Sequence, residues 1–146
     1  MARRQYSVHK RGDREQYLAI GYPMAKSLAW RSLGGNALKV WIELHTRYHG
    51  HNNGKLSLSF DEAARLLHMG KASVSRAFAE LKTKGFIKLR KQGRWYGRKA
   101  SEYELTTKPC DGRIATQEWR NWRPRPEDKC RRGPKKSFLG FDPDHE

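Results

Sequence analysis

The chain has 146 residues, with 31 Lys plus Arg against 15 Asp plus Glu, which gives a formal net charge of +16 at pH 7. Its length suits one domain with tails, and a hydrophobic share of 36% indicates that part of the chain stays outside a packed core. No stretch approaches the ~18 apolar residues of a membrane span and no signal-peptide core follows Met1, so we expect a cytoplasmic, nucleoid-associated protein with no membrane partner. The strong positive charge favours nucleic acid as the partner.

Residues 1–16 are basic and almost free of apolar side chains, so they predict a segment that is flexible in isolation. Two interpretations remain open for it. It is either a solvated tail or an arm that contacts DNA phosphate or the minor groove.

The next segments predict a scaffold for the domain. Tyr17–Ile20 is expected to be extended, and Pro23 to open a short helix that runs through Trp30. Gly34 and Gly35 interrupt this pattern. A longer helix is expected over 36–49, because its apolar residues recur at intervals of three and four: Ala37, Val40, Trp41, Leu44 and Tyr48.

Three histidines surround the end of this predicted helix: His45, His49 and His51. Because no acidic or thiol ligand accompanies them, we interpret them as a solvated helix end and not as a metal site. A single short strand is expected at 56–58.

A second helix is predicted from Phe60 onward. Ser59 and Glu62 form the S-x-x-E pattern of a capping box, in which each side chain satisfies one free amide at the start of a helix. Small and apolar residues give this helix an inner face, formed by Ala63, Ala64, Leu66 and Leu67. A turn is expected at 68–70.

A third helix is predicted over 71–84. Its buried side is expected to carry Val74, Ala77, Phe78 and Leu81, which forces Ala72, Arg76, Ala79 and Thr83 to point outward. A polar outer face is common in any soluble domain and does not by itself indicate DNA binding. The DNA-binding interpretation depends on the position of this helix within the order of elements. The residues expected to meet a major groove are Lys71, Ala72, Ser73, Ser75 and Arg76, with Arg76 as the direct reader of a base.

Two strands, at 86–91 and 102–106, are expected to enclose a hairpin loop over 92–100. Ile87 and Leu89 should lie on one face of the first strand, with Lys88 and Arg90 on the other. In the loop, Arg94, Arg98 and Lys99 offer cations to phosphate or to the minor groove. Trp95 and Tyr96 have two open interpretations: packing over the hairpin, or wedging against sugars and bases.

The order of these elements predicts an α+β, mainly α fold: a winged helix-turn-helix domain over 17–107, with a three-helix core and a β-hairpin wing. The segments 30–44, 58–67, 73–81 and 84–87 resemble small bacterial winged helix-turn-helix proteins, which include plasmid- and phage-borne regulators and replication-initiator-like proteins. The resemblance implies that 71–76 enter the major groove and that 94–99 form the wing. This chain has His68 where many relatives have Gly, and Gly70 where they have Ser or Thr.

Residues 108–146 lack periodicity and are rich in proline and glycine, which predicts an irregular tail. Trp119 and Trp122 alternate with arginines in it. Docking back on the domain, contact with nucleic acid, and contact with a transcription or replication protein are all open to them. Neither Cys110 nor Cys130 has a C-x-x-C partner, so we interpret both as reduced thiols and expect no metal and no cofactor.

We therefore expect a transcriptional regulator that binds a specific double-stranded DNA sequence, commonly as a homodimer on a palindromic site. The alternative is a plasmid or phage replication-initiator-like protein. We do not expect an enzyme, because the sequence contains no phosphate-binding loop, H-E-x-x-H or G-x-S-x-G motif.

Overall fold

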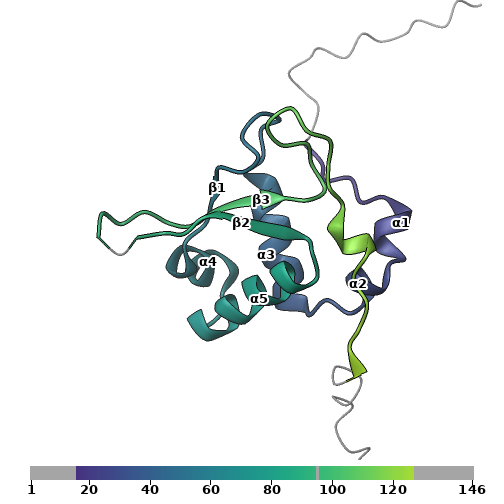
Figure 1. The fold of residues 1–146 in the computed structure, drawn as a ribbon. Coiled ribbons are helices and arrows are strands. Elements are labelled where there is room, and N and C mark those ends of the chain that lie inside the picture. Colours follow the sequence, from purple (N-terminus) through teal and green to yellow (C-terminus); the bar gives the residue numbers. More distant parts are fainter. Residues whose placement is uncertain (1–15, 95, 127–146) are drawn as a thin grey trace, which may run out of the picture.

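The computed structural model describes residues 16–94 and 96–126, which form an α+β domain (Figure 1). Five α-helices, one 3₁₀ helix and a three-stranded antiparallel sheet occur in these ranges. None of the helices in this part of the chain is long and apolar enough to span a bilayer. The elements are α1 (Tyr22–Ala25), α2 (Leu28–Arg31), α3 (Gly35–Thr46), β1 (Leu56–Ser57), α4 (Phe60–Leu67), α5 (Lys71–Thr83), β2 (Ile87–Lys91), β3 (Glu102–Leu105) and η1 (Glu118–Arg120).

The helix expected from Pro23 to Trp30 is divided into α1 and α2. Ser27 causes the break: its hydroxyl donates to the carbonyl of Met24 (2.7 Å) and accepts from the amide of Trp30 (3.1 Å). The same side chain therefore ends the first helix and caps the second. Tyr17–Ile20, expected to be extended, forms no strand.

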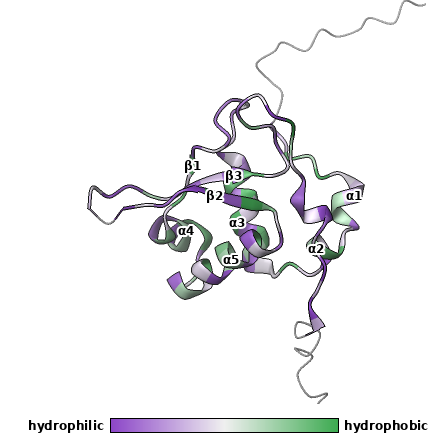
Figure 2. Cartoon of the chain, in the orientation of Figure 1, coloured by the Kyte–Doolittle hydropathy of each residue, from purple (hydrophilic) through white to green (hydrophobic). Residues whose placement is uncertain are grey.

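The core lies between α3, α5 and the inner face of the sheet. The predicted buried face of α3 is confirmed, with Ala37, Val40, Trp41 and Leu44 at most 1% exposed. Figure 2 shows the apolar residues of α3 and α5 among the elements that surround this core. α3 ends at Thr46, so Tyr48 lies beyond it.

The sheet order is β1-β3-β2, and β3 pairs with both neighbours in antiparallel register. The pairing is regular from Ile87 to Leu89, so these two residues lie on one face of β2, as predicted. Their burial differs, since Ile87 is 1% exposed and Leu89 is 38% exposed. Burial falls along β2 toward the loop, where the strand pair extends beyond the helices (Figure 1).

The C-terminal segment packs on this core. Trp119 is 5% exposed and stacks on Phe86 with ring centroids 6.4 Å apart, and Trp122 packs partly buried beside it. Docking is therefore confirmed for both tryptophans among the interpretations that the sequence left open.

Buried Asn53 holds the same segment to the sheet. Its Oδ1 accepts from the amide of Leu105 (2.7 Å), and its Nδ2 donates toward the carbonyls of Leu105, Lys108 and Pro109 (2.9–3.1 Å). Two amide hydrogens serve three carbonyls, so one hydrogen is shared. The start of the segment 108–126 is thus held against β3 by Asn53.

His45 corrects the interpretation of the histidines. It is 8% exposed, and its Nδ1 lies 2.9 Å from the carbonyl of Trp41 and its Nε2 2.9 Å from the hydroxyl of Thr107. The C-terminal segment covers this end of α3, so His45 is not solvated. His49 and His51 are exposed, as expected.

Candidate nucleic-acid interface

The turn between α4 and α5 runs through residues 68–70. His68 adopts the left-handed region (φ 52°, ψ 51°), where a glycine is under least strain. Gly70 precedes the first residue of α5 and supplies no side-chain cap. The first amides of α5 are therefore free of a side-chain acceptor from the cap, a state that favours a nearby anion.

The two faces of α5 follow the prediction. Val74, Ala77, Phe78 and Leu81 are at most 2% exposed and pack against α3 and α4. The residues expected to point outward do so and are exposed: Ala72, Arg76, Ala79 and Thr83, together with Ser75. The outer surface of α5 is consequently short-chained around one arginine.

Arg76 is held loosely. Its Nε donates to the carbonyl of Ala72 over 3.3 Å, a long bond on an exposed surface. Within residues 16–94 and 96–126, no carboxylate lies within 4.0 Å of its guanidinium. The guanidinium can therefore reorient toward a base or a phosphate without first breaking an ion pair.

Ser73 differs from its neighbours because it is half-buried. It lines a shallow cleft, together with Arg76, against the start of α3 at Gly35 and Asn36. The sequence singled out the glycine pair as a break, and it gave no signal that Asn36 would stand beside Arg76.

Lys71 is paired with Asp61, the second residue of α4, with 2.5 Å between Nζ and Oδ1. Both side chains are about three-quarters exposed (73% and 74%). An exposed pair of this kind contributes little to stability, because solvent screens it. An external anion such as a phosphate group can therefore replace Asp61 as the partner of Lys71.

The start of α4 is fixed to α3. Ser59 caps α4 as predicted, accepting from the amide of Glu62 (3.1 Å). Arg47 donates to both Glu62 (2.9 Å) and Glu43 (3.0 Å). The hydrogen bond from Arg47 lowers the pKa of Glu62, and a hydrogen bond from the backbone of Ser59 acts in the same direction.

The hairpin continues β2 and β3 outward as expected. The amide of Arg94 donates to the carbonyl of Lys99 (3.1 Å), and that of Gly93 to the hydroxyl of Ser101 (2.9 Å). A Cβ at position 93 would lie 2.6 Å from the Lys99 carbonyl oxygen, so the two strands approach this closely only with glycine there.

The hairpin exposes its charged residues. Arg94, Arg98 and Lys99 are all exposed, and Tyr96 is 92% exposed. The interpretation that Tyr96 packs over the hairpin is therefore wrong. Trp95, the remaining predicted site residue, lies outside the described residues.

A groove of about 780 Å³ separates the hairpin from the start of α4. Arg94, Arg98 and Lys99 line the hairpin side, and Ser59 and Asp61 belong to the α4 side. Asp61 also pairs with Lys71, so the first residue of α5 is joined to the α4 side of the groove.

Two other cations of the sheet are turned toward the protein. Lys88 pairs with Glu118 (2.5 Å), and Arg90 pairs with Asp111 (2.7 Å) and with Glu104 (3.5 Å). The period-two pattern correctly placed Lys88 and Arg90 on the face opposite Ile87 and Leu89. It could not show that the C-terminal segment supplies carboxylates there.

The structure thus brings Arg94, Arg98 and Lys99 to one side of a groove and pairs Lys71 with Asp61 of its other side, and it places Ser73 and Arg76 at a separate cleft. Ala72 and Ser75 are exposed on α5. No known protein family, no curated protein and no solved structure matches this chain.

Proposed function

We propose that this protein is a winged helix-turn-helix regulator of transcription that binds a specific double-stranded DNA sequence. The order α4, turn, α5, β2, hairpin, β3 supports this, since it is the order of a reading helix followed by a wing (Figure 1). In the proposal α5 enters the major groove and the hairpin contacts the backbone or the minor groove.

The observation that carries the proposal is the group of exposed cations beside the groove. Arg94, Arg98 and Lys99 face the start of α4 across it, and Lys71 is joined to that start through Asp61. Exposed cations on two neighbouring elements suit two adjacent phosphate contacts, because the DNA backbone carries regularly spaced negative charges.

The outer face of α5 supplies the means of reading sequence. Ala72 and Ser75 are short enough to let the helix backbone come close to base edges, and Arg76 has a guanidinium that can bind guanine through two hydrogen bonds. Such a contact discriminates against the wrong base by ~1–3 kcal/mol.

The proposal is tested by selecting bound fragments from random duplex DNA and comparing the selected site with unrelated DNA of equal length. We expect a preference of ~10³-fold or more. Arg76→Ala should reduce this preference by roughly 10- to 100-fold while leaving affinity for unrelated DNA nearly unchanged. Arg113→Ala, which removes an exposed arginine from the Cys110–Arg113 turn, is the matched control and should leave the preference intact.

Equal affinity for all duplexes would contradict sequence-specific regulation. The symmetry of the selected site separates the remaining alternatives. A palindrome bound by two chains, with the mass of the complex measured in solution, supports a homodimeric regulator, whereas direct repeats support the replication-initiator alternative.

A further inference from the structure

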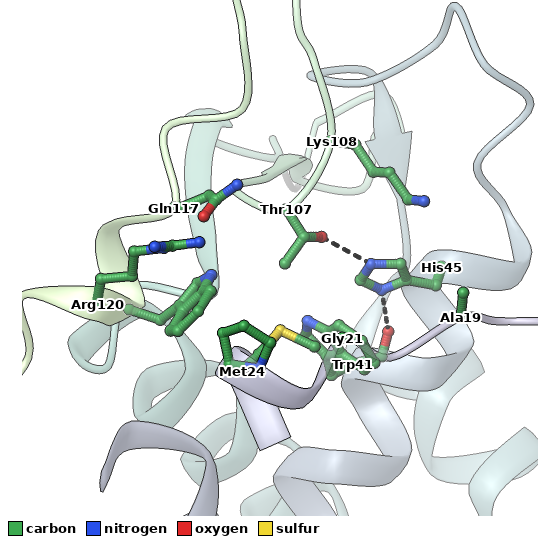
Figure 3. A pocket seen from close by; sticks show the side chains of 11 residues that line it. Ala19, Gly21, Met24, Trp41, His45, Thr107, Lys108, Gln117 and Arg120 are labelled. Atoms are coloured by element: carbon green, nitrogen blue, oxygen red, sulfur yellow. Dashed lines mark hydrogen bonds between the residues drawn. The ribbon is translucent and has the colours of Figure 1, made fainter. Parts of the chain in front are cut away.

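A cavity of about 250 Å³ is lined by residues of α1, of α3 and of the segment that carries η1 (Figure 3). Apolar side chains form its walls: Pro23, Met24, Trp41 and Trp119. For comparison, a cavity of ~150 Å³ in a protein core holds one benzene ring. The cavity therefore has room for a molecule of one ring and a small substituent.

Two buried donors line this cavity. The indole N–H groups of Trp41, which is 1% exposed, and of Trp119, which is 5% exposed, have no hydrogen-bond acceptor among the residues that the structure describes. Buried donors in folded proteins are nearly always paired, because each unpaired one costs ~1–3 kcal/mol. Two such groups at one cavity indicate a ligand that accepts hydrogen bonds.

The charge at the cavity has one sign. Lys108 and Arg120 line it, and none of the described lining residues is acidic. Neither cation lies within 4.0 Å of a carboxylate in residues 16–94 and 96–126, and each instead lies over an aromatic ring, Tyr48 for Lys108 and Trp119 for Arg120. An anion at the cavity is therefore favoured over a neutral acceptor.

His45 also faces this region, but its polar atoms are already satisfied. The Trp41 carbonyl can only accept, so Nδ1 carries the hydrogen of the neutral ring and Nε2 accepts from Thr107 (Figure 3). The free donors at the cavity are thus the two indoles, and the free charges are Lys108 and Arg120.

We propose that this cavity binds a small organic acid whose apolar body lies against Met24 and the two tryptophans and whose carboxylate accepts from the indole N–H groups of Trp41 and Trp119. Lys108 and Arg120 supply the opposite charge at its edge. The site stands on these contacts alone and is independent of the proposed DNA binding.

The test is a titration of the full ¹⁵N-labelled chain with sodium benzoate at constant ionic strength, followed through the tryptophan indole ¹H–¹⁵N resonances. Each resonance is assigned by a Trp→Phe variant. We expect the Trp41 and Trp119 resonances to shift together with a dissociation constant on the order of 1 mM, and the Trp122 resonance to shift far less. Benzyl alcohol, which has nearly the same size and no charge, should bind at least roughly tenfold more weakly.

Charge variants complete the test. Lys108→Gln and Arg120→Gln should each weaken benzoate binding by roughly three- to tenfold, and Arg113→Gln, an exposed arginine that does not line the cavity, should leave it unchanged. The proposal is overturned if the Trp41 and Trp119 resonances do not move in the wild-type protein, or if benzyl alcohol binds as well as benzoate. Equal losses in Arg113→Gln and the two cavity variants would also overturn it.

Discussion

His45 lies where α3 meets the C-terminal segment, and its burial has a consequence for pH. Desolvation lowers the pKa of His45 from 6.5 to about 4, and the positive charge of Lys108 acts in the same direction, against the hydrogen bond to Trp41. The folded protein therefore holds a neutral imidazole at pH values where the unfolded chain has already taken up the proton.

This residue predicts a loss of stability in mild acid. Because the folded pKa lies below the unfolded one, the contribution is complete above pH 6.5 and is lost as the pH falls toward about 4. The difference is on the order of 3 kcal/mol between pH 7 and pH 4. Urea unfolding at a series of pH values should show a smaller slope for His45→Gln than for the wild type.

The matched control for this pH series is His49→Gln, because His49 is exposed at the end of the same helix. That variant should keep the wild-type slope. If His45→Gln and the wild type lost stability equally between pH 6.5 and pH 4, the neutral buried imidazole would be refuted.

At the scale of elements, α5 is joined to both the sheet and the C-terminal segment through Gly85. This residue has φ +75°, and a Cβ there would lie 2.9 Å from backbone atoms of Glu118 and Trp119. Both the backbone angle and the close approach of η1 require glycine. The turn at Gly85, which follows the proposed reading helix, therefore depends on a segment that begins at Glu118, more than thirty residues later in the chain.

Gly85→Ala should destabilise the protein by at least about 2 kcal/mol in urea unfolding, since the new methyl group meets backbone that cannot move independently. Gly35→Ala is the control, because position 35 is helical and a Cβ there has no neighbour within 4 Å. It should be neutral or stabilising by up to ~1 kcal/mol. Equal effects of the two substitutions would show that η1 does not press on this turn.

At the scale of the whole molecule, the cations of the sheet and hairpin fall into two groups, those paired with carboxylates and those that stay exposed. The cations at the base of the sheet pair with carboxylates of the C-terminal segment, as Lys88 does with Glu118. Those at the hairpin, Arg94, Arg98 and Lys99, remain exposed, and Figure 2 shows the outer hairpin as largely hydrophilic. The hairpin therefore carries positive surface charge that no ion pair within residues 16–94 and 96–126 neutralises.

This division predicts the salt dependence of the proposed DNA binding. Arg94→Ala and Arg98→Ala should each lower affinity for selected and unrelated DNA alike, and each should reduce the slope of log K against log salt concentration by about 1. The measurement is fluorescence anisotropy with labelled duplexes over a range of salt concentrations. An unchanged slope in both variants would remove the hairpin from the DNA contact.

The helical periodicity predicted the buried faces of α3 and α5 well, because apolar residues at intervals of three and four share one face of a helix. The buried set Val74, Ala77, Phe78 and Leu81 is the clearest instance. On α4 it was wrong at Leu66, which is 45% exposed. Period-two alternation predicted that Ile87 and Leu89 share a face, but it did not predict that Leu89 is 38% exposed, since burial depends on how far the helices reach along the strand, which no local pattern encodes.

The sequence by itself determined the charge, the buried faces of α3 and α5, the hairpin and the cations of its loop, because each of these follows from local spacing and composition. Only the tertiary structure decided which cations are neutralised, as at Arg90 with Asp111, and which histidine is buried. It also decided that Trp119 belongs to the core and borders a cavity with Trp41. These outcomes depend on contacts between segments far apart in the chain, and such contacts leave no periodic signal in either segment.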